Sequence, residues 1–397
     1  MKTRFFKLFL LVLAISASIP SLACTSAIFS GKSTPDGRPL LWKNRDTGEL
    51  NNRIEYYPVS SANKYSFIGL GNSEKSKGEI WTGTNSEGFS IMNTASYNLQ
   101  EKKASFEDME GVVMCKALGC CSTLADFEKL LDTMEKPLGV EANFGVIDAL
   151  GGAAYYEVNN YEWRKIDVND PKIAPEGYLV YTNHSYTGRI NEGSGYIRYA
   201  TANSIVLKQW IKGEGFTPQW IFNNLSRSYY NALLDLDLKK TPEATPSGWF
   251  PDTDFIPRRS TSASIVVKGV KPGEDPSLTV MWTILGYPPC GIAVPLFAVA
   301  GADQPAVMMK GNDTEKCEMC NQALARRAKV FSNQRSNARN YFNYKVAADY
   351  IEMLSPVEDV NFREGEAFLS EGYKAGKISA ADARNFYKRL VFGEDTK

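Results

Sequence analysis

Short runs in which apolar and polar residues alternate make up most of the chain, and turn-forming residues separate them. Two such runs, residues 24–31 and 39–46, flank Thr34-Pro35-Asp36-Gly37. Proline presets the φ angle at the start of a turn, and glycine closes the turn without a steric penalty. The pattern therefore predicts a β-hairpin. Counted outward from the turn, Cys24 falls opposite residue 47, and a slip of one or two residues places it beside Asn44-Arg45-Asp46.

The same pattern continues along the chain and predicts a mixed α+β fold. Further strands are expected at 79–84, 89–93, 143–149, 153–159, 178–183, 261–268 and 278–285. Apolar residues that recur every three or four positions predict helices at 122–136, 199–212 and 218–236. Residues 241–257 are rich in Pro, Thr and Asp and predict a long loop, and from about 313 onward the sequence becomes charged and helix-forming.

The first 23 residues have the three parts of a secretory signal peptide. Lys2, Arg4 and Lys7 precede the apolar run 8–19, and Ser21-Leu22-Ala23 offers small residues at the positions that signal peptidase reads. The apolar run is too short to span a membrane. We therefore expect a secreted or periplasmic protein, not inserted in a membrane after signal removal, with an enzyme domain at 24–300 and a C-terminal helical extension at 301–397.

Composition excludes several classes of function. The chain has 45 basic and 45 acidic residues, which gives no electrostatic reason to expect a nucleic-acid partner. It has a single histidine, His184, so a multi-histidine metal site is ruled out, and any catalytic triad would have to use that residue. We expect neither a metal nor a cofactor, and the sequence leaves a homo-oligomer open.

The chain has seven cysteines, so one stays unpaired if the other six form disulfides, and Cys24 is the natural candidate for the unpaired one. The spacing Cys317-Glu318-Met319-Cys320 predicts a local disulfide or two thiols rather than a redox centre.

Cys24 would be the first residue after signal removal. Its α-amine has an ordinary pKa of about 7.7–8.0, so this amine can act as the general base for its own thiol. The alternatives are a lipid attachment site or a disulfide partner, although Ser21 is unusual three residues before a lipidated cysteine.

Four segments, taken in order, resemble the choloylglycine hydrolase and penicillin V acylase superfamily of N-terminal-nucleophile (Ntn) hydrolases. The segments are Cys24-Thr25-Ser26-Ala27 with Asn44-Arg45-Asp46, residues 83–93 ending in Asn93, Tyr181-Thr182-Asn183-His184, and Arg258-Arg259-Ser260-Thr261 followed by Gly286-Tyr287-Pro288-Pro289-Cys290. The superfamily also includes isopenicillin N acyltransferases and N-terminal-cysteine dipeptidases. The resemblance covers about residues 24–297 and implies a four-layer αββα sandwich.

The resemblance also implies a role for each matched residue. Cys24 would be the nucleophile, and Asp46 would hold its amine or thiol in position. Asn93 and Asn183 would donate hydrogen bonds to the oxyanion, each worth roughly 2.7–4 kcal/mol. Arg259 would favour the thiolate, with Arg258 as a competing candidate.

Each of these residues also has a plainer interpretation. Asp46 would then only cap the hairpin, the asparagines would be turn or edge residues, and the arginine would be a surface charge. His184 is interpreted as part of the site wall or as a structural residue. Lys43 stands where bile salt hydrolases have arginine, which argues against a simple assignment to that branch.

The sequence thus predicts an exported hydrolase that cleaves a small linear amide through a thioester on Cys24. Acyl transfer and dipeptide cleavage are the alternatives within the superfamily. A lipid-anchored or disulfide-stapled binding protein is the non-enzyme alternative.

Overall fold

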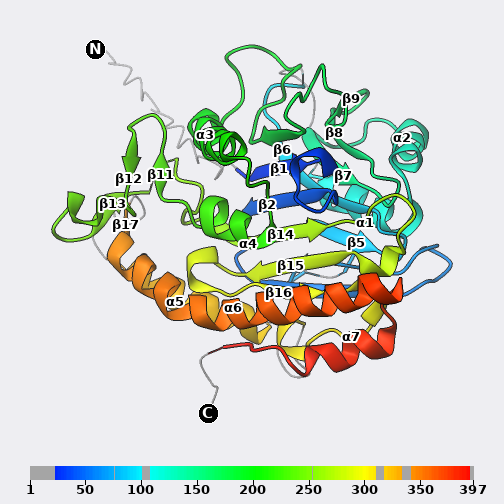
Figure 1. Cartoon of the computed structure of the whole chain (residues 1–397). Helices are drawn as coiled ribbons and strands as arrows, with labels where there is room; N and C mark the ends of the chain where they lie inside the picture. The colour runs from blue at the N-terminus through cyan, green and yellow to red at the C-terminus, as the bar shows by residue number, and fades with distance from the viewer. Residues whose placement is uncertain are drawn as a thin grey trace, which may run out of the picture.

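The computed structural model describes residues 23–75, 77–100, 108–252, 254–309, 317–332 and 341–393. The predicted signal peptide lies outside these residues except for Ala23. Two antiparallel sheets form the centre of the molecule (Figure 1). The first has six strands in the order β10 (Tyr178–Tyr181), β1 (Thr25–Phe29), β2 (Leu40–Asp46), β14 (Thr261–Lys268), β15 (Val280–Leu285) and β16 (Val294–Leu296).

The second sheet has seven strands in simple sequence order. They are β3 (Asn52–Tyr57), β4 (Phe67–Asn72), β5 (Thr82–Asn85), β6 (Ser90–Ala95), β7 (Ala142–Ile147), β8 (Ala153–Val158) and β9 (Trp163–Asp167). Two short ribbons complete the strands: β11 (Tyr230–Asn231) with β12 (Leu236–Asp237), and β13 (Trp249–Pro251) with β17 (Tyr341–Asn343).

The two sheets pack face to face. Strands β1 and β2 of the first sheet contact β6, β7 and β8 of the second. The Ser26 hydroxyl of β1 lies 3.0 Å from the Tyr155 hydroxyl of β8. A Cβ at Gly145 would lie 2.3 Å from the Met92 side chain and 3.1 Å from the Ile28 side chain, so only glycine fits where the sheets meet. Burial of this apolar interior is the main force that holds the sheets together.

Helices cover both outer faces. The second sheet is covered by α1 (Glu110–Cys120) and α2 (Leu124–Thr133), whose Phe127 ring lies 5.9 Å from that of Phe144. The first sheet is covered by α3 (Tyr196–Lys212), α4 (Pro218–Ile221), α5 (Glu318–Val330), α6 (Tyr344–Ala375) and α7 (Ala380–Tyr387) (Figure 1). The expected αββα sandwich is therefore confirmed.

Most of the predicted elements are present. The hairpin of β1 and β2 turns through Gly37, whose φ is +74°, and β5 and β6 turn through Gly88 at +76°. Helix α2 begins at a capping box formed by Thr123 and Asp126. The paired strands β7 and β8 and the paired strands β14 and β15 also match the prediction. Helix α1 was not predicted, because buried residues surround it and leave no clear polar face.

The helix predicted at 218–236 is wrong beyond its second turn. Helix α4 continues only through a π-helical turn that ends at Ser226, and the chain then forms the β11–β12 ribbon. Asn231 Oδ1 accepts the backbone N–H groups of Leu233 and Leu234, which fixes a tight turn. The two leucines that completed the apolar helical pattern are 69% and 66% exposed at its tip.

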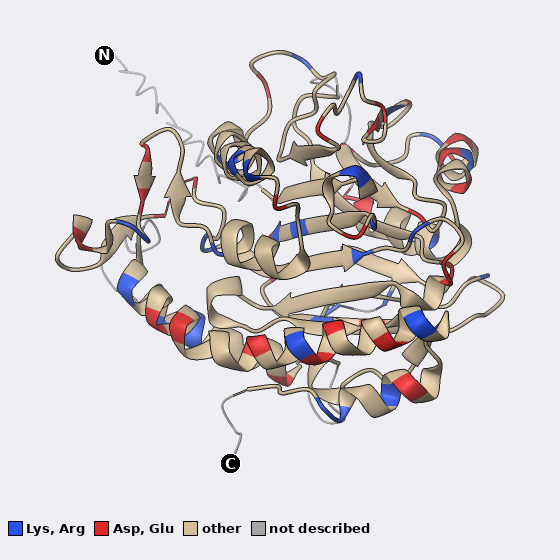
Figure 2. Cartoon of the chain, viewed as in Figure 1, with Lys and Arg blue, Asp and Glu red and all other residues tan. Residues whose placement is uncertain are grey.

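The long loop predicted at 241–257 is interrupted by β13, whose partner β17 lies about 90 residues further along the chain. The charged C-terminal segment forms α5, α6 and α7 as expected. Figure 2 shows basic and acidic residues of α6 spread along its outer side, while the strands beneath it are largely uncharged. On the inner side, the Phe362 ring of α6 stacks 4.3 Å from Trp282 of β15. Within the described ranges, no helix is long and apolar enough to cross a membrane.

Candidate active site

The first hairpin brings Cys24 to the end of β2. The register pairs Thr25 with Asn44, so that Cys24 lies level with Arg45. The Cys24 sulfur is 3.9 Å from the carbonyl oxygen of Asp46, and the residue is 6% exposed. The register predicted from the turn is confirmed. In this structure the Cys24 nitrogen still belongs to the peptide bond with Ala23.

The Asp46 carboxylate is held on both oxygens. Its Oδ2 accepts a hydrogen bond from Arg258 Nε at 2.7 Å, and its Oδ1 accepts one from Thr261 Oγ1 at 2.5 Å. Arg258 Nη2 also donates to the carbonyl oxygen of Ala23 at 2.8 Å. Burial alone would lower the pKa of Arg258, but the Asp46 carboxylate outweighs it and raises that pKa. Arg258 is therefore a permanent cation beside the Ala23–Cys24 bond.

Arg259 lies on the other side of the chain. Its backbone N–H donates to Asp252 Oδ2 at 3.0 Å, and its guanidinium lies 4.6 Å from the centre of the Phe331 ring. The sequence left open which of the two arginines enters the site. The structure places Arg258 against Asp46 and places Arg259 in an aromatic cluster under α5.

Asn93 lies at the point where β5 and β6 diverge. Lys43 reaches this point from β2 and donates to Asn93 Oδ1 at 2.6 Å and to the Trp81 carbonyl oxygen at 2.9 Å. An ammonium group only donates, so this contact fixes which end of the Asn93 amide carries the oxygen. Lys43 is 1% exposed, and burial lowers its pKa to about 8.

Asn183 follows β10 and is held in the same way by Arg198 of α3. Arg198 Nη2 donates to Asn183 Oδ1 at 2.8 Å, while Nη1 donates to the Cys24 carbonyl oxygen at 2.7 Å and to Thr25 Oγ1 at 2.8 Å. Asn183 Nδ2 donates to the Ala95 carbonyl oxygen at 2.8 Å. Arg198 thus links the first strand to the second asparagine.

His184 lies in an aromatic cluster beside this segment. Its ring stacks 4.4 Å from that of Tyr196, and its Nδ1 is 3.2 Å from Thr182 Oγ1. Burial lowers the pKa of His184, so the ring is neutral at neutral pH. These contacts suit the predicted role of a wall or structural residue.

Sequence reasoning did not single out Arg45 and Arg198 as parts of the site. Burial lowers the pKa of each to about 10, and the Cys24 charge partly opposes the change. Arg45 comes two residues after Lys43 in β2 and shares its face of the strand, so strand alternation could have indicated it. Arg198 comes from a helix beyond a long loop, and no local pattern signals it. Together with Lys43 and Arg258, these cations give the site a positive potential that favours a thiolate or an oxyanion.

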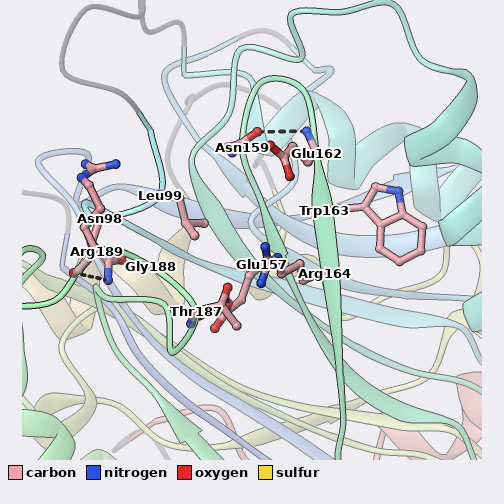
Figure 3. A pocket seen from close by; sticks show the side chains of 10 residues that line it. All are labelled: Asn98, Leu99, Glu157, Asn159, Glu162, Trp163, Arg164, Thr187, Gly188 and Arg189. Carbon is pink, nitrogen blue, oxygen red and sulfur yellow. Dashed lines mark hydrogen bonds between the residues drawn. The ribbon is translucent and has the colours of Figure 1, made fainter.

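Two cavities in the described part of the chain lie outside this cluster. One, of about 170 Å³, lies between β8, β9 and the segment 187–189 (Figure 3). The other, of about 290 Å³, lies between the turn of the first hairpin, α4 and α6. Neither is lined by Cys24, Asp46, Asn93 or Asn183. No group of His, Cys, Asp and Glu able to hold a metal ion occurs among the described residues.

No family model matches the sequence, and no curated protein matches it. Solved structures do match. A variant of conjugated bile acid hydrolase from Clostridium perfringens matches with a TM-score of 0.39 and 13% identity, over 69% of this chain and 92% of that one. An N-acylethanolamine-hydrolyzing acid amidase ortholog from Caenorhabditis elegans gives 0.38 and 14%, over 61% and 92%.

Penicillin V acylase from Agrobacterium tumefaciens matches with a TM-score of 0.36 and 10% identity, over 69% of this chain and 85% of that one. These TM-scores lie below 0.5, so any role for a residue of this chain rests on the chain's own geometry.

Proposed function

We propose that the protein is an N-terminal-nucleophile hydrolase that cleaves linear amide C–N bonds through a thioester on Cys24. The observation that carries this proposal is the convergence of Cys24, the doubly anchored Asp46 and the two oriented asparagines. These groups come from the residue before β1, from β2 and β6, and from the end of β10. Three buried cations, Lys43, Arg45 and Arg198, and the partly buried Arg258 surround them.

The proposed reaction begins once Cys24 is the first residue. Its α-amine takes the thiol proton, directly or through one water, and the thiolate attacks the amide carbonyl. The Nδ2 group of Asn93 and the second Nδ2 hydrogen of Asn183 stabilise the developing oxyanion, since Lys43 and Arg198 hold the Oδ1 end of each amide. The first Nδ2 hydrogen of Asn183 remains on the Ala95 carbonyl oxygen. The ammonium then protonates the leaving amine, and water hydrolyses the thioester.

The test uses three proteins. The first starts at residue 24, the second starts at residue 24 and carries Cys24→Ser, and the third starts at residue 23. Amide cleavage is measured on a panel of N-acyl amino acids, conjugated bile salts, penicillin V and dipeptides. We expect activity only in the first protein, because serine is a poorer nucleophile here and a preceding residue converts the amine into an amide. Cys115→Ser, a half-buried thiol on α1, is the matched control and should stay active.

Full activity in the Cys24→Ser variant, or in the protein that keeps Ala23, would refute the free-amine mechanism. Intact mass of the protein recovered from its producing cells tests the export proposal separately. A terminus at Cys24 with no adduct supports it. A lipid adduct on Cys24 would instead support the tethered binding protein.

A further inference from the structure

The Cys317-x-x-Cys320 motif has no role in the proposed reaction, yet a single residue, Asn52, separates it in space from Arg45 of the site. Cys317 caps the N-terminus of α5 by accepting the N–H of Cys320 at 3.4 Å. Both side chains are buried, at 0% and 1% exposure, and both carry thiols in this structure. Two cysteines at this spacing on the first turn of a helix are close enough to form a disulfide.

Both thiols contact the backbone of a single residue, Asn52, at the start of β3. The Cys317 thiol donates to the Asn52 carbonyl oxygen at 3.1 Å, and the Asn52 N–H donates to Cys320 Sγ at 3.3 Å. The Asn52 side chain then continues toward the site, and its Oδ1 accepts a hydrogen bond from Arg45 Nη1. The dithiol therefore holds the residue that positions the Arg45 guanidinium.

Arg45 in turn faces Cys24. The two residues are level across the β1–β2 pair, and paired residues of neighbouring strands point to the same face of a sheet. The Arg45 guanidinium lies 4.7 Å from the centre of the Trp81 ring and is 3% exposed as a residue. A buried cation at this position stabilises the thiolate of Cys24 more than an exposed one would, because little water screens it.

We propose that Cys317 and Cys320 form a dithiol–disulfide modification site whose state is transmitted through Asn52 and Arg45 to the Cys24 thiol. The oxidant is a small-molecule disulfide of the glutathione type. Thiol–disulfide exchange joins the two sulfurs, the two electrons reduce the small disulfide, and the two thiol protons leave with the two small thiols that are released. The proposal rests on the proposed function only in taking Cys24 as the reactive thiol.

Oxidation removes the hydrogen that Cys317 donates to Asn52. The Asn52 carbonyl then loses a partner at the start of β3, and the side chain that holds Arg45 is fixed only by its own bonds to the carbonyl oxygens of Leu50 and Ser262. A guanidinium that is less well fixed stabilises the Cys24 thiolate less. The hydrogen bond between the Cys317 thiol and Cys320, together with burial, raises the pKa of Cys317, so exchange is slow in the folded protein. The oxidised form is therefore best prepared by refolding in the disulfide.

The experiment follows the rate of alkylation of Cys24 by iodoacetamide at pH 7, read by peptide mass spectrometry in the protein that starts at residue 24. Samples are refolded in reduced or in oxidised glutathione, and a Cys317–Cys320 crosslink is mapped in each. We expect the crosslink only in the oxidised sample, with Cys24 alkylated about threefold to tenfold more slowly there, because the thiolate is the form that reacts.

Two variants separate the hydrogen bond from the crosslink. Cys317→Ser keeps a hydroxyl donor to Asn52 but forms no disulfide, so it should behave as the reduced protein in both buffers. Cys317→Ala lacks the donor and should show the slower alkylation in both, and circular dichroism verifies that it folds. Absence of the crosslink at every glutathione ratio, or identical alkylation rates in the two forms, would overturn the proposal. Alkylation needs no amide turnover, so its result stands apart from the proposed hydrolase activity.

Discussion

Asp46 connects three parts of the site through its carboxylate. Its two oxygens join the end of β2 to Arg258 and to the first residue of β14, and its side chain is 1% exposed. An anchored carboxylate at the end of β2 can orient the amine of Cys24, whereas a mobile one cannot. Removing one partner of such a buried pair leaves an uncompensated charge.

We therefore predict that Arg258→Gln lowers kcat/KM about a hundredfold, because Asp46 loses the cation that holds it in position. Arg259→Gln is the matched control and should change kcat/KM by less than about twofold, because Arg259 contacts Phe331 instead. Steady-state kinetics on both variants, with thermal melts to verify folding, test this contrast. Equal losses in the two would show that the catalytic cation is assigned incorrectly.

Lys43 gives the site a pH limit of its own. Its pKa of about 8 means that the ammonium is charged below that pH and neutral above it. The strong charge-assisted hydrogen bond to Asn93 is present only in the charged form. We predict that kcat falls as the pH rises through about 8, and that Lys43→Met lowers kcat about a hundredfold at pH 7.

Lys43→Arg is the control for this prediction, since a guanidinium keeps its charge. It should retain part of the activity and move the alkaline limb to higher pH. A pH–rate profile that keeps the same alkaline limb in Lys43→Arg would show that a group other than Lys43 is responsible for it.

The sequence could indicate the site where a short stretch of chain determines the geometry. Cys24 and Asp46 are joined by one hairpin, so counting from the turn placed them together. Arg258 and Arg259 point to opposite sides of the chain in a loop, and only the fold of that loop distinguishes them. Arg198 reaches Cys24 and Asn183 from a helix that follows a long connection, and nothing local to it indicates this contact.

At the level of elements, a buried ion pair lies directly after the helical segment that begins with α4 and joins it to α6. Arg227, directly after the π-helical turn, donates to both oxygens of Glu358 in α6 at 2.8 and 2.6 Å, and Glu358 also accepts the N–H of Ala293. The pattern of apolar residues predicted that the helix would continue through 236. Long-range pairing of Arg227 prevailed over that local preference, which is why the prediction failed there.

Glu358→Gln should therefore destabilise the protein by about 3–5 kcal/mol, because Arg227 keeps its buried charge without a counter-charge. Glu371→Gln, on the exposed side of the same helix, should change the free energy of unfolding by less than about 0.5 kcal/mol. Urea denaturation of both variants measures the difference. A Glu358→Gln protein as stable as the control would mean that the pair is not buried in solution.

At the scale of the whole molecule, the C-terminal helices share one core with the sheets. Trp282 of β15 stacks on Phe362 of α6, and a Cβ at Gly365 would lie 2.5 Å from the same indole. The sequence correctly indicated helices after about 313. It could not indicate how closely they pack, because helix patterns show an apolar stripe without showing what covers it.

We predict that a chain ending at residue 309 does not fold, because the outer face of the first sheet would be left exposed to water. Circular dichroism and size-exclusion chromatography of the chain 24–309 measure this, with 24–393 as the control. A monomeric 24–309 protein with a cooperative melt would show that the enzyme domain is independent of its extension.

Ala23 is buried at 1% exposure, and its carbonyl oxygen is bound by Arg258. A chain that keeps this residue therefore carries a buried peptide unit directly before Cys24, with its carbonyl oxygen on Arg258. Recombinant protein with a tag or an initiator methionine before Cys24 would differ from the processed chain in two ways. It would lack the free amine, and a peptide carbonyl would remain bound to Arg258.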